Sequence, residues 1–115
     1  MNQILKDLGI KEINLGSCVG AENWIDNSES NYIESYNPTN GELLAKVKLC
    51  TESNYEDVIN ASNKAFESWR MVPAPVRGQL ILEMANELRN KKDLLGSLVA
   101  LEMGKIKAEG DGEVQ

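Results

Sequence analysis

Residues 73–105, PAPVRGQLILEMANELRNKKDLLGSLVALEMGK, are the stretch that decides the fold. Apolar side chains recur there three and four positions apart, which is the spacing of one helix face. The first group is Leu80, Ile81, Met84, Ala85 and Leu88, and the second is Leu94, Leu98 and Leu101 with Leu95 and Val99 beside them. The pattern predicts two consecutive amphipathic helices. We expect the residues before them to pack on these helices. The stretch contains no set of side chains suited to catalysis.

Local signals predict where these two helices begin and end. Pro73 and Pro75 break the chain, and Pro75 can open the first helix because a proline in the first turn loses no hydrogen bond. Asp93 is a plausible N-cap for the second helix. Gly104 is its predicted end, since glycine readily takes the left-handed conformation found there.

A third helix is predicted upstream, over residues 53–69. Ser53 and Glu56 have the spacing of a capping box, in which hydroxyl and carboxylate satisfy each other's free backbone donors. An apolar stripe follows at helical spacing: Val58, Ile59, Ala61, Ala65, Phe66 and Trp69.

Residues 32–49 predict a β-hairpin. Two segments rich in β-forming residues, YIESY and LLAKVKL, flank the sequence NPTNGE. Proline presets φ for a turn, and Asn-Gly tolerates the positive φ of tight turns. A lone hairpin is marginally stable, so we expect it to have a partner.

The N-terminal thirty residues give weaker signals. Residues 2–9 predict a short helix that ends at Gly9. Residues 10–30 predict an irregular arm, in which we expect the Trp24 side chain to be anchored in a larger packed structure. We interpret Trp24, Phe66 and Trp69 as core anchors, because no basic groove accompanies them as in a nucleic-acid stacking platform.

Composition excludes several classes of function. The 115-residue chain carries a net charge of −6 and no basic cluster, which disfavours partners such as nucleic acid or an anionic membrane. It contains no histidine, so His-based catalysis and His metal sites are excluded within it. No apolar run approaches the ~20 residues of a membrane span. The two cysteines, Cys18 and Cys50, are distant in sequence, and no secretory signal is recognisable. Both observations predict that the protein is located in the reducing cytoplasm.

The remaining motifs favour structural over chemical roles. Residues 110–113, GDGE, lack the length of a calcium loop, so we interpret them as solvated or closely packed. Gly104 and Lys105 lack the upstream glycine of a phosphate-binding loop. Glu102 and Lys105 predict a surface ion pair rather than acid–base chemistry. Neither cysteine has a candidate base, so we name no catalytic, cofactor-binding or metal-ligating residue.

The order of segments NPTNGELLAKV, PAPVRGQLILEMANELR and LLGSLVALEMGKIKAEGDGEVQ resembles the N-terminal part of the aldehyde dehydrogenase superfamily. The last two segments look most like the antiquitin branch, the α-aminoadipic semialdehyde (piperideine-6-carboxylate) dehydrogenases. The likeness runs from about residue 5 to residue 115. Asp111 departs from it, because the resemblance implies an apolar residue there, in a helix near the substrate site. Glycines on either side of Asp111 would permit close helix approach.

The resemblance implies an α/β fold, of which this chain would supply an N-terminal helix, one hairpin and three to four helices. It implies three parts: an arm over 1–30, a hairpin over 31–50, and a helical segment of an NAD-binding domain over 51–115. It also implies an oligomeric enzyme that uses NAD to oxidise an aldehyde to a carboxylic acid. The catalytic cysteine and nicotinamide site of such enzymes map onto no residue here, so this chain alone is predicted to be inactive.

Two alternatives remain open from the sequence. The chain could be a non-catalytic interaction module or truncated subunit that packs on full-length relatives or on itself, because its predicted elements leave apolar faces unmatched. It could also be a small helical domain unrelated to dehydrogenases.

Overall fold

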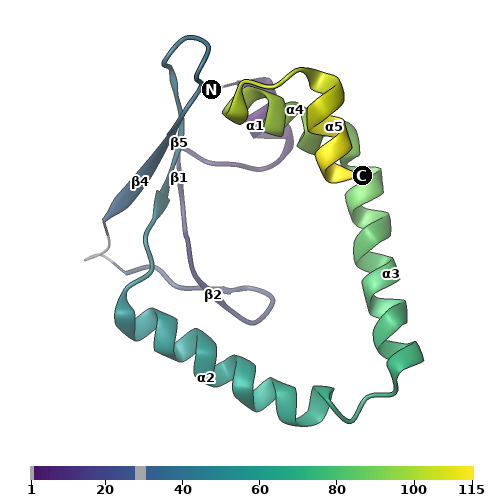
Figure 1. The fold of residues 1–115 in the computed structure, drawn as a ribbon. Helices are drawn as coiled ribbons and strands as arrows, with labels where there is room; N and C mark the ends of the chain where they lie inside the picture. Colours follow the sequence, from purple (N-terminus) through teal and green to yellow (C-terminus); the bar gives the residue numbers. More distant parts are fainter. Residues whose placement is uncertain (1, 28–30) are drawn as a thin grey trace.

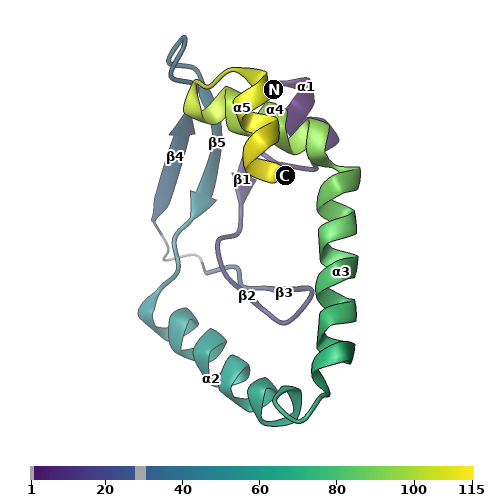
Figure 2. The same ribbon diagram turned by 45° about the vertical axis from the view of Figure 1, so that its right-hand side comes forward.

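The computed structural model describes residues 2–27 and 31–115 and has a mixed α/β fold. Figure 1 shows the elements arranged as a ring, with the sheet on one side, α3 opposite, α2 below, and α4 and α5 above. Figure 2 shows the same arrangement from a second direction. In chain order the elements are α1 (Gln3–Asp7), β1 (Ile13–Asn14), β2 (Cys18–Val19), β3 (Asn23–Trp24), β4 (Tyr32–Tyr36), β5 (Leu43–Lys48), α2 (Glu52–Trp69), α3 (Ala74–Asn90), α4 (Lys92–Met103) and α5 (Lys107–Val114).

The predicted hairpin is confirmed as the antiparallel pair β4–β5. Its turn closes where the amide of Gly41 donates to the Asn37 carbonyl at 2.8 Å, and Gly41 has φ +73° as the Asn-Gly sequence predicts. The partner that the hairpin requires is β1, which pairs in parallel with β5 and makes a three-stranded sheet. The N-terminal arm therefore stabilises the hairpin.

The arm itself is more regular than the sequence predicts. It contains the three two-residue strands β1, β2 and β3, and the last two pair with each other. Trp24, at the end of β3, is 57% exposed. The described residues therefore do not enclose the tryptophan that we expect to be an anchor.

Helix α4 is where separate parts of the chain meet. Leu5 of the short helix α1, which is confirmed, is only 2% exposed, and α1 lies against α4. The hydroxyl of Ser35 in β4 donates to the Glu102 carboxylate of α4 at 2.6 Å. Gly104 ends α4 with φ +70°, as predicted, and the Pro38 ring of the hairpin turn lies against it. Helix α4 thus fixes both α1 and the hairpin.

The expectation that the whole chain packs on residues 73–105 is wrong for the first half of that stretch. Helix α3 contains no buried residue, and α2 buries only Asn54. Phe66 and Trp69 are 56% and 38% exposed, so the core-anchor interpretation fails for them, as for Trp24. An apolar stripe predicts a buried face, but the described chain covers the stripe of α2 only in part, near β2, and leaves that of α3 open.

Two predicted helix caps are also wrong. Helix α2 begins two residues earlier than the Ser53–Glu56 capping box implies, because Thr51 Oγ1 accepts the Asn54 amide at 3.2 Å. Helix α4 follows α3 with only Lys91 between them, so Asp93 lies within the first turn of α4 and does not cap it. Pro75 does lie in the first turn of α3, as predicted.

The corrected cap makes a prediction. Replacing Thr51 by alanine removes the oxygen that accepts the Asn54 amide, and we expect a loss of about 1 kcal/mol of helix stability. Ser53→Ala is the matched control, because no cap bond involves its hydroxyl, and its effect is expected to be a few tenths of a kcal/mol. Circular dichroism of the three proteins measures the helix content. Equal losses for both variants would restore Ser53 as a capping residue.

Candidate functional site

Polar side chains on the sheet form one cluster of titratable groups. Lys46 Nζ lies 2.6 Å from Glu34 Oε1, and the Tyr36 hydroxyl donates to the same carboxylate. The Lys46 hydrogen bond, followed by that of Tyr36, lowers the pKa of Glu34. The bond to Glu34 in turn raises the pKa values of Tyr36 and Lys46. Each shift favours the charge state already present at neutral pH, so the cluster is suited to holding strands together rather than to transferring protons.

A second polar cluster joins α4 to α5. Lys107 Nζ contacts Asp111 one turn along α5 and lies 3.0 Å from Asp93 Oδ1 of α4. The hydrogen bond to Asp111 is the main cause that raises the pKa of Lys107. Lys92 Nζ of α4 also donates to the Gln115 side chain at 2.7 Å. These contacts stabilise one arrangement of the two helices.

The predicted ion pair between Glu102 and Lys105 is wrong. Lys105 pairs with Glu113 of α5, which raises the pKa of the lysine, whereas Glu102 accepts the Ser35 hydroxyl. The side chain of Glu102 is therefore engaged by the sheet, while Lys105 is drawn towards α5.

Residues 110–113 are helical, and the first of them is closely packed while the last two are exposed. Gly110 is buried, and a Cβ built on it would lie 2.2 Å from the Gly96 carbonyl oxygen of α4. Gly112 has no neighbour within 4 Å, so only one of the two glycines serves close approach. Asp111, the departure from the family pattern, is half-buried, lies against Gly96 and binds Lys107. The carboxylates of this segment are thus neutralised by lysines.

The cysteines lie apart and have structural surroundings. The half-buried Cys18 thiol donates to the Gly20 carbonyl at 2.8 Å, and the exposed Cys50 thiol lies 3.4 Å from the Thr51 carbonyl. Both are free thiols. A carbonyl acceptor does not activate a thiol as a base would, so neither arrangement resembles a nucleophilic centre.

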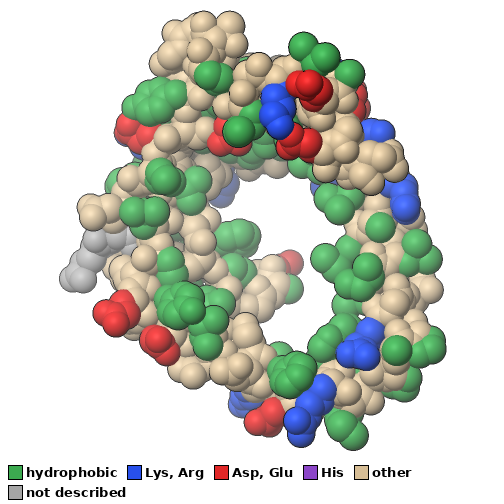
Figure 3. All heavy atoms as spheres, in the orientation of Figure 1, with side chains coloured by type: hydrophobic (Ala, Val, Ile, Leu, Met, Phe, Trp, Pro, Cys, Tyr) green, Lys and Arg blue, Asp and Glu red, His purple; other side chains and the backbone are tan. Residues whose placement is uncertain are grey.

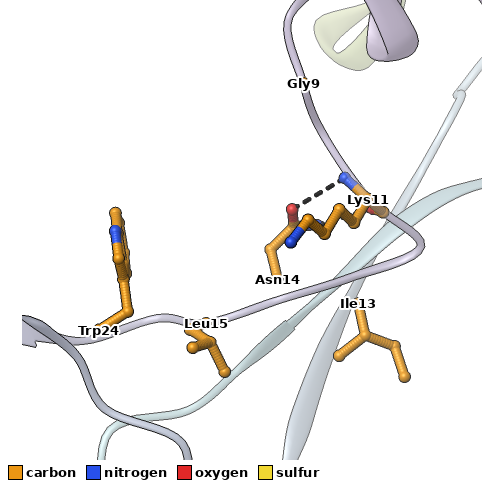
Figure 4. Close-up of a pocket in the computed structure, with 6 residues that line it drawn as sticks. All are labelled: Gly9, Lys11, Ile13, Asn14, Leu15 and Trp24. Carbon is orange, nitrogen blue, oxygen red and sulfur yellow. Dashed lines mark hydrogen bonds between the residues drawn. The ribbon is translucent and has the colours of Figure 1, made fainter. Parts of the chain in front are cut away.

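The arm lines a recess of about 340 Å³, and Figure 4 shows the residues around it. Its walls are Gly9, Lys11, Ile13, Asn14, Leu15 and Trp24. The Asn14 side chain accepts the Lys11 amide at 3.0 Å and donates to the Lys11 carbonyl at 2.8 Å, so it is occupied in holding the loop. Lys11 is the only ionisable residue among the six, and it has no carboxylate or thiol beside it there. This recess lacks the paired groups that acid–base or nucleophilic catalysis requires.

Three further observations concern metal binding, dinucleotide binding and membrane spans in the part of the chain that is described. Residues 2–27 and 31–115 contain no group of three metal-ligating side chains. Strand β5 leads into α2 through Leu49, Cys50 and Thr51, none of which is glycine, so its turn lacks the close backbone approach of a dinucleotide site. None of the helices among these residues has both the length and the apolar character needed to cross a membrane. The polar clusters and close glycine contacts described above serve to hold the helices and strands in place.

Some of the contacts described above join residues far apart in sequence. Ser35 and Glu102 are separated by 67 positions, and Lys92 and Gln115 by 23. Helical spacing signals only neighbours three or four apart, as with Lys107 and Asp111. Sequence reasoning missed the others because no local pattern reports them.

Comparison with known proteins shows which family this chain resembles. The profile of the aldehyde dehydrogenase family matches residues 24–115. Aldehyde dehydrogenase family 7 member A1 of Pisum sativum is 44% identical over 96% of this chain, which corresponds to 21% of the relative. The alpha-aminoadipic semialdehyde dehydrogenase of Rattus norvegicus is 43% identical over 96% of this chain and 20% of its own length. The chain thus spans about one fifth of these relatives.

Solved structures agree with the sequence comparison. A betaine aldehyde dehydrogenase of Staphylococcus aureus, solved in complex with NAD+, matches with a TM-score of 0.76 and 27% identity. The match covers 85% of this chain and 20% of that enzyme. These likenesses contradict the alternative of a small helical domain unrelated to dehydrogenases. This chain belongs to the aldehyde dehydrogenase family.

Proposed function

We propose that this chain forms the N-terminal part of an NAD-dependent aldehyde dehydrogenase that oxidises an amino-acid-derived semialdehyde to a carboxylic acid. The observation that carries the proposal is the 43% identity to an alpha-aminoadipic semialdehyde dehydrogenase over 96% of this chain. The NAD+ bound to the Staphylococcus aureus neighbour supports the choice of cofactor. The division into an arm (1–30), a hairpin (31–50) and a helical segment (51–115), cytoplasmic location and homo-oligomeric assembly belong to the same proposal.

The role of these residues in that reaction is architectural. The polar clusters tie the sheet and α5 to α4, and none of them contains a nucleophile beside a base. We therefore assign no catalytic step and no cofactor contact to the chain. In the intact enzyme its task would be to support the parts that bind NAD and aldehyde.

The test is dehydrogenase activity with and without the rest of a subunit. We expect the 115-residue chain, mixed with NAD and an aliphatic semialdehyde, to give no increase in NADH absorbance. A hybrid in which this chain replaces the matched stretch of the Pisum sativum relative is expected to produce NADH. Activity from the chain alone, or an inactive but folded hybrid, would contradict the proposal.

A further inference from the structure

This chain exposes more surface than a self-contained protein of its length. Its accessible surface is 8447 Å², whereas a globular monomer of this size exposes roughly 6,200 Å². Its radius of gyration is 17.0 Å, against about 13 Å for a compact domain. The excess of roughly 2,200 Å² has the scale of permanent rather than transient interfaces.

Much of this surface is apolar and borders the inside of the ring. Figure 3 shows an opening through the molecule with hydrophobic side chains along its rim. A hollow of about 470 Å³ lies between α3 and the start of α4, with apolar walls of Met84, Leu88 and Leu95. Met84 and Leu88 are 57% and 50% exposed. Glu83, Glu87 and Lys91 border the hollow, so it has the apolar centre and charged rim of a protein interface.

Helix α3 requires a covering partner. It is 17 residues long and has no buried residue, whereas helices in proteins draw most of their stability from packing of an apolar face. We infer that the surface formed by Met84, Leu88 and Leu95 is covered by the rest of an aldehyde dehydrogenase subunit. That partner is the remaining four fifths that the relatives possess and this chain does not span. The inference rests on the proposed function, which supplies the identity of the partner.

A second copy of this chain fits the surface less well. A two-fold dimer brings the same patch of both copies together. The rim residues of each copy, Glu83, Glu87 and Lys91, would then meet the same three residues of the other, with two carboxylates to one ammonium on each side, in chains that each carry a charge of −6. Like charges placed opposite each other disfavour association.

The experiment compares hydrogen exchange of α3 in two settings. In the 115-residue chain we expect the amides of α3 to exchange rapidly, and in the hybrid with the Pisum sativum relative about 100-fold more slowly. Leu88→Asp in the hybrid places a charge in the covered hollow and is expected to speed this exchange at least about tenfold. Asn86→Asp is the matched control: it adds the same charge on the same helix outside the hollow, and an aspartate can still accept the 2.8 Å bond from Arg89. We expect it to change exchange by less than about twofold.

Other outcomes would overturn the inference. They are equal exchange in the hybrid and the isolated chain, equal effects of the two aspartates, or an isolated chain that sediments as a dimer with a protected α3. If the hybrid does not fold, the isolated chain is tested with a dye that binds exposed apolar surface. We expect the chain to bind the dye, Leu88→Asp to reduce this binding, and Asn86→Asp to leave it unchanged. A compact monomer that binds no dye would refute the inference.

The proposed function can fail separately. A hybrid that protects α3 but forms no NADH would uphold the surface and reject the activity. A hybrid that forms NADH while α3 stays unprotected would uphold the activity and reject the covered surface.

Discussion

Replacing Gly110 by alanine is expected to separate α5 from α4. The added methyl group would lie 2.2 Å from the Gly96 carbonyl oxygen and 3.3 Å from the Ala100 amide nitrogen, and both are backbone atoms that cannot rotate away. Overpacking of this kind costs about 1–3 kcal/mol. Because 1.4 kcal/mol is a tenfold change in an equilibrium constant, we expect the amides of α5 to exchange about 10- to 100-fold faster.

Gly112→Ala is the matched control on the same helix. Nothing lies within 4 Å of the position, so alanine gains helix propensity without a clash and is expected to stabilise α5 by about 0.5–1 kcal/mol. Gly96→Ala tests the contact from the other side, since its methyl group would lie 2.8 Å from the Asp111 amide nitrogen. The two clashing variants should therefore behave alike. If Gly110→Ala and Gly112→Ala had the same effect, close packing at Gly110 would not be what holds α5.

The parts of the fold that sequence predicts are those with a local physical cause. The hairpin turn needs a residue that tolerates positive φ, and the sequence places Gly41 there. The end of α4 needs the same property and has Gly104. The cap of α2 shows the limit of such reasoning, since Thr51 and Ser53 are both suitable hydroxyls two positions apart. Backbone geometry selects Thr51, and the spacing of side chains alone does not reveal it.

Burial could not be predicted in the same way. The helical stripes of α2 and α3 are real, but Phe66 and Met84 remain more than half exposed because no described element lies over them. A pattern specifies which face of a helix is apolar and says nothing of where the covering surface is. Long-range polar contacts escaped prediction for a related reason, since the Ser35–Glu102 and Lys92–Gln115 hydrogen bonds join residues 67 and 23 positions apart.

Replacing Gly16 by alanine is expected to disrupt the junction between the arm and the sheet. A Cβ at this position would lie 2.0 Å from the Lys48 carbonyl oxygen at the end of β5 and 3.2 Å from a methyl group of Val47. The arm just before it is held by the Lys46 amide, which donates to the Glu12 carbonyl at 2.9 Å. Moving the arm away to relieve the clash must lengthen that bond. The amide of Lys46 is therefore expected to exchange about tenfold faster or more.

Ser17→Ala is the control for this change, because it alters the next residue and adds no atom near β5. The Ser17 carbonyl, which accepts the Ile25 amide at 3.0 Å, is retained in that variant. Exchange at Lys46 that is unchanged in Gly16→Ala would mean that the arm can shift without loosening β1. A selective effect at Lys46, with slow exchange preserved across the β4–β5 pairs, would show that Gly16 is what allows the arm to lie along the sheet. Since β1 is the only strand beside β5 on that edge among the described residues, its loss would leave the hairpin with the marginal stability of an isolated pair.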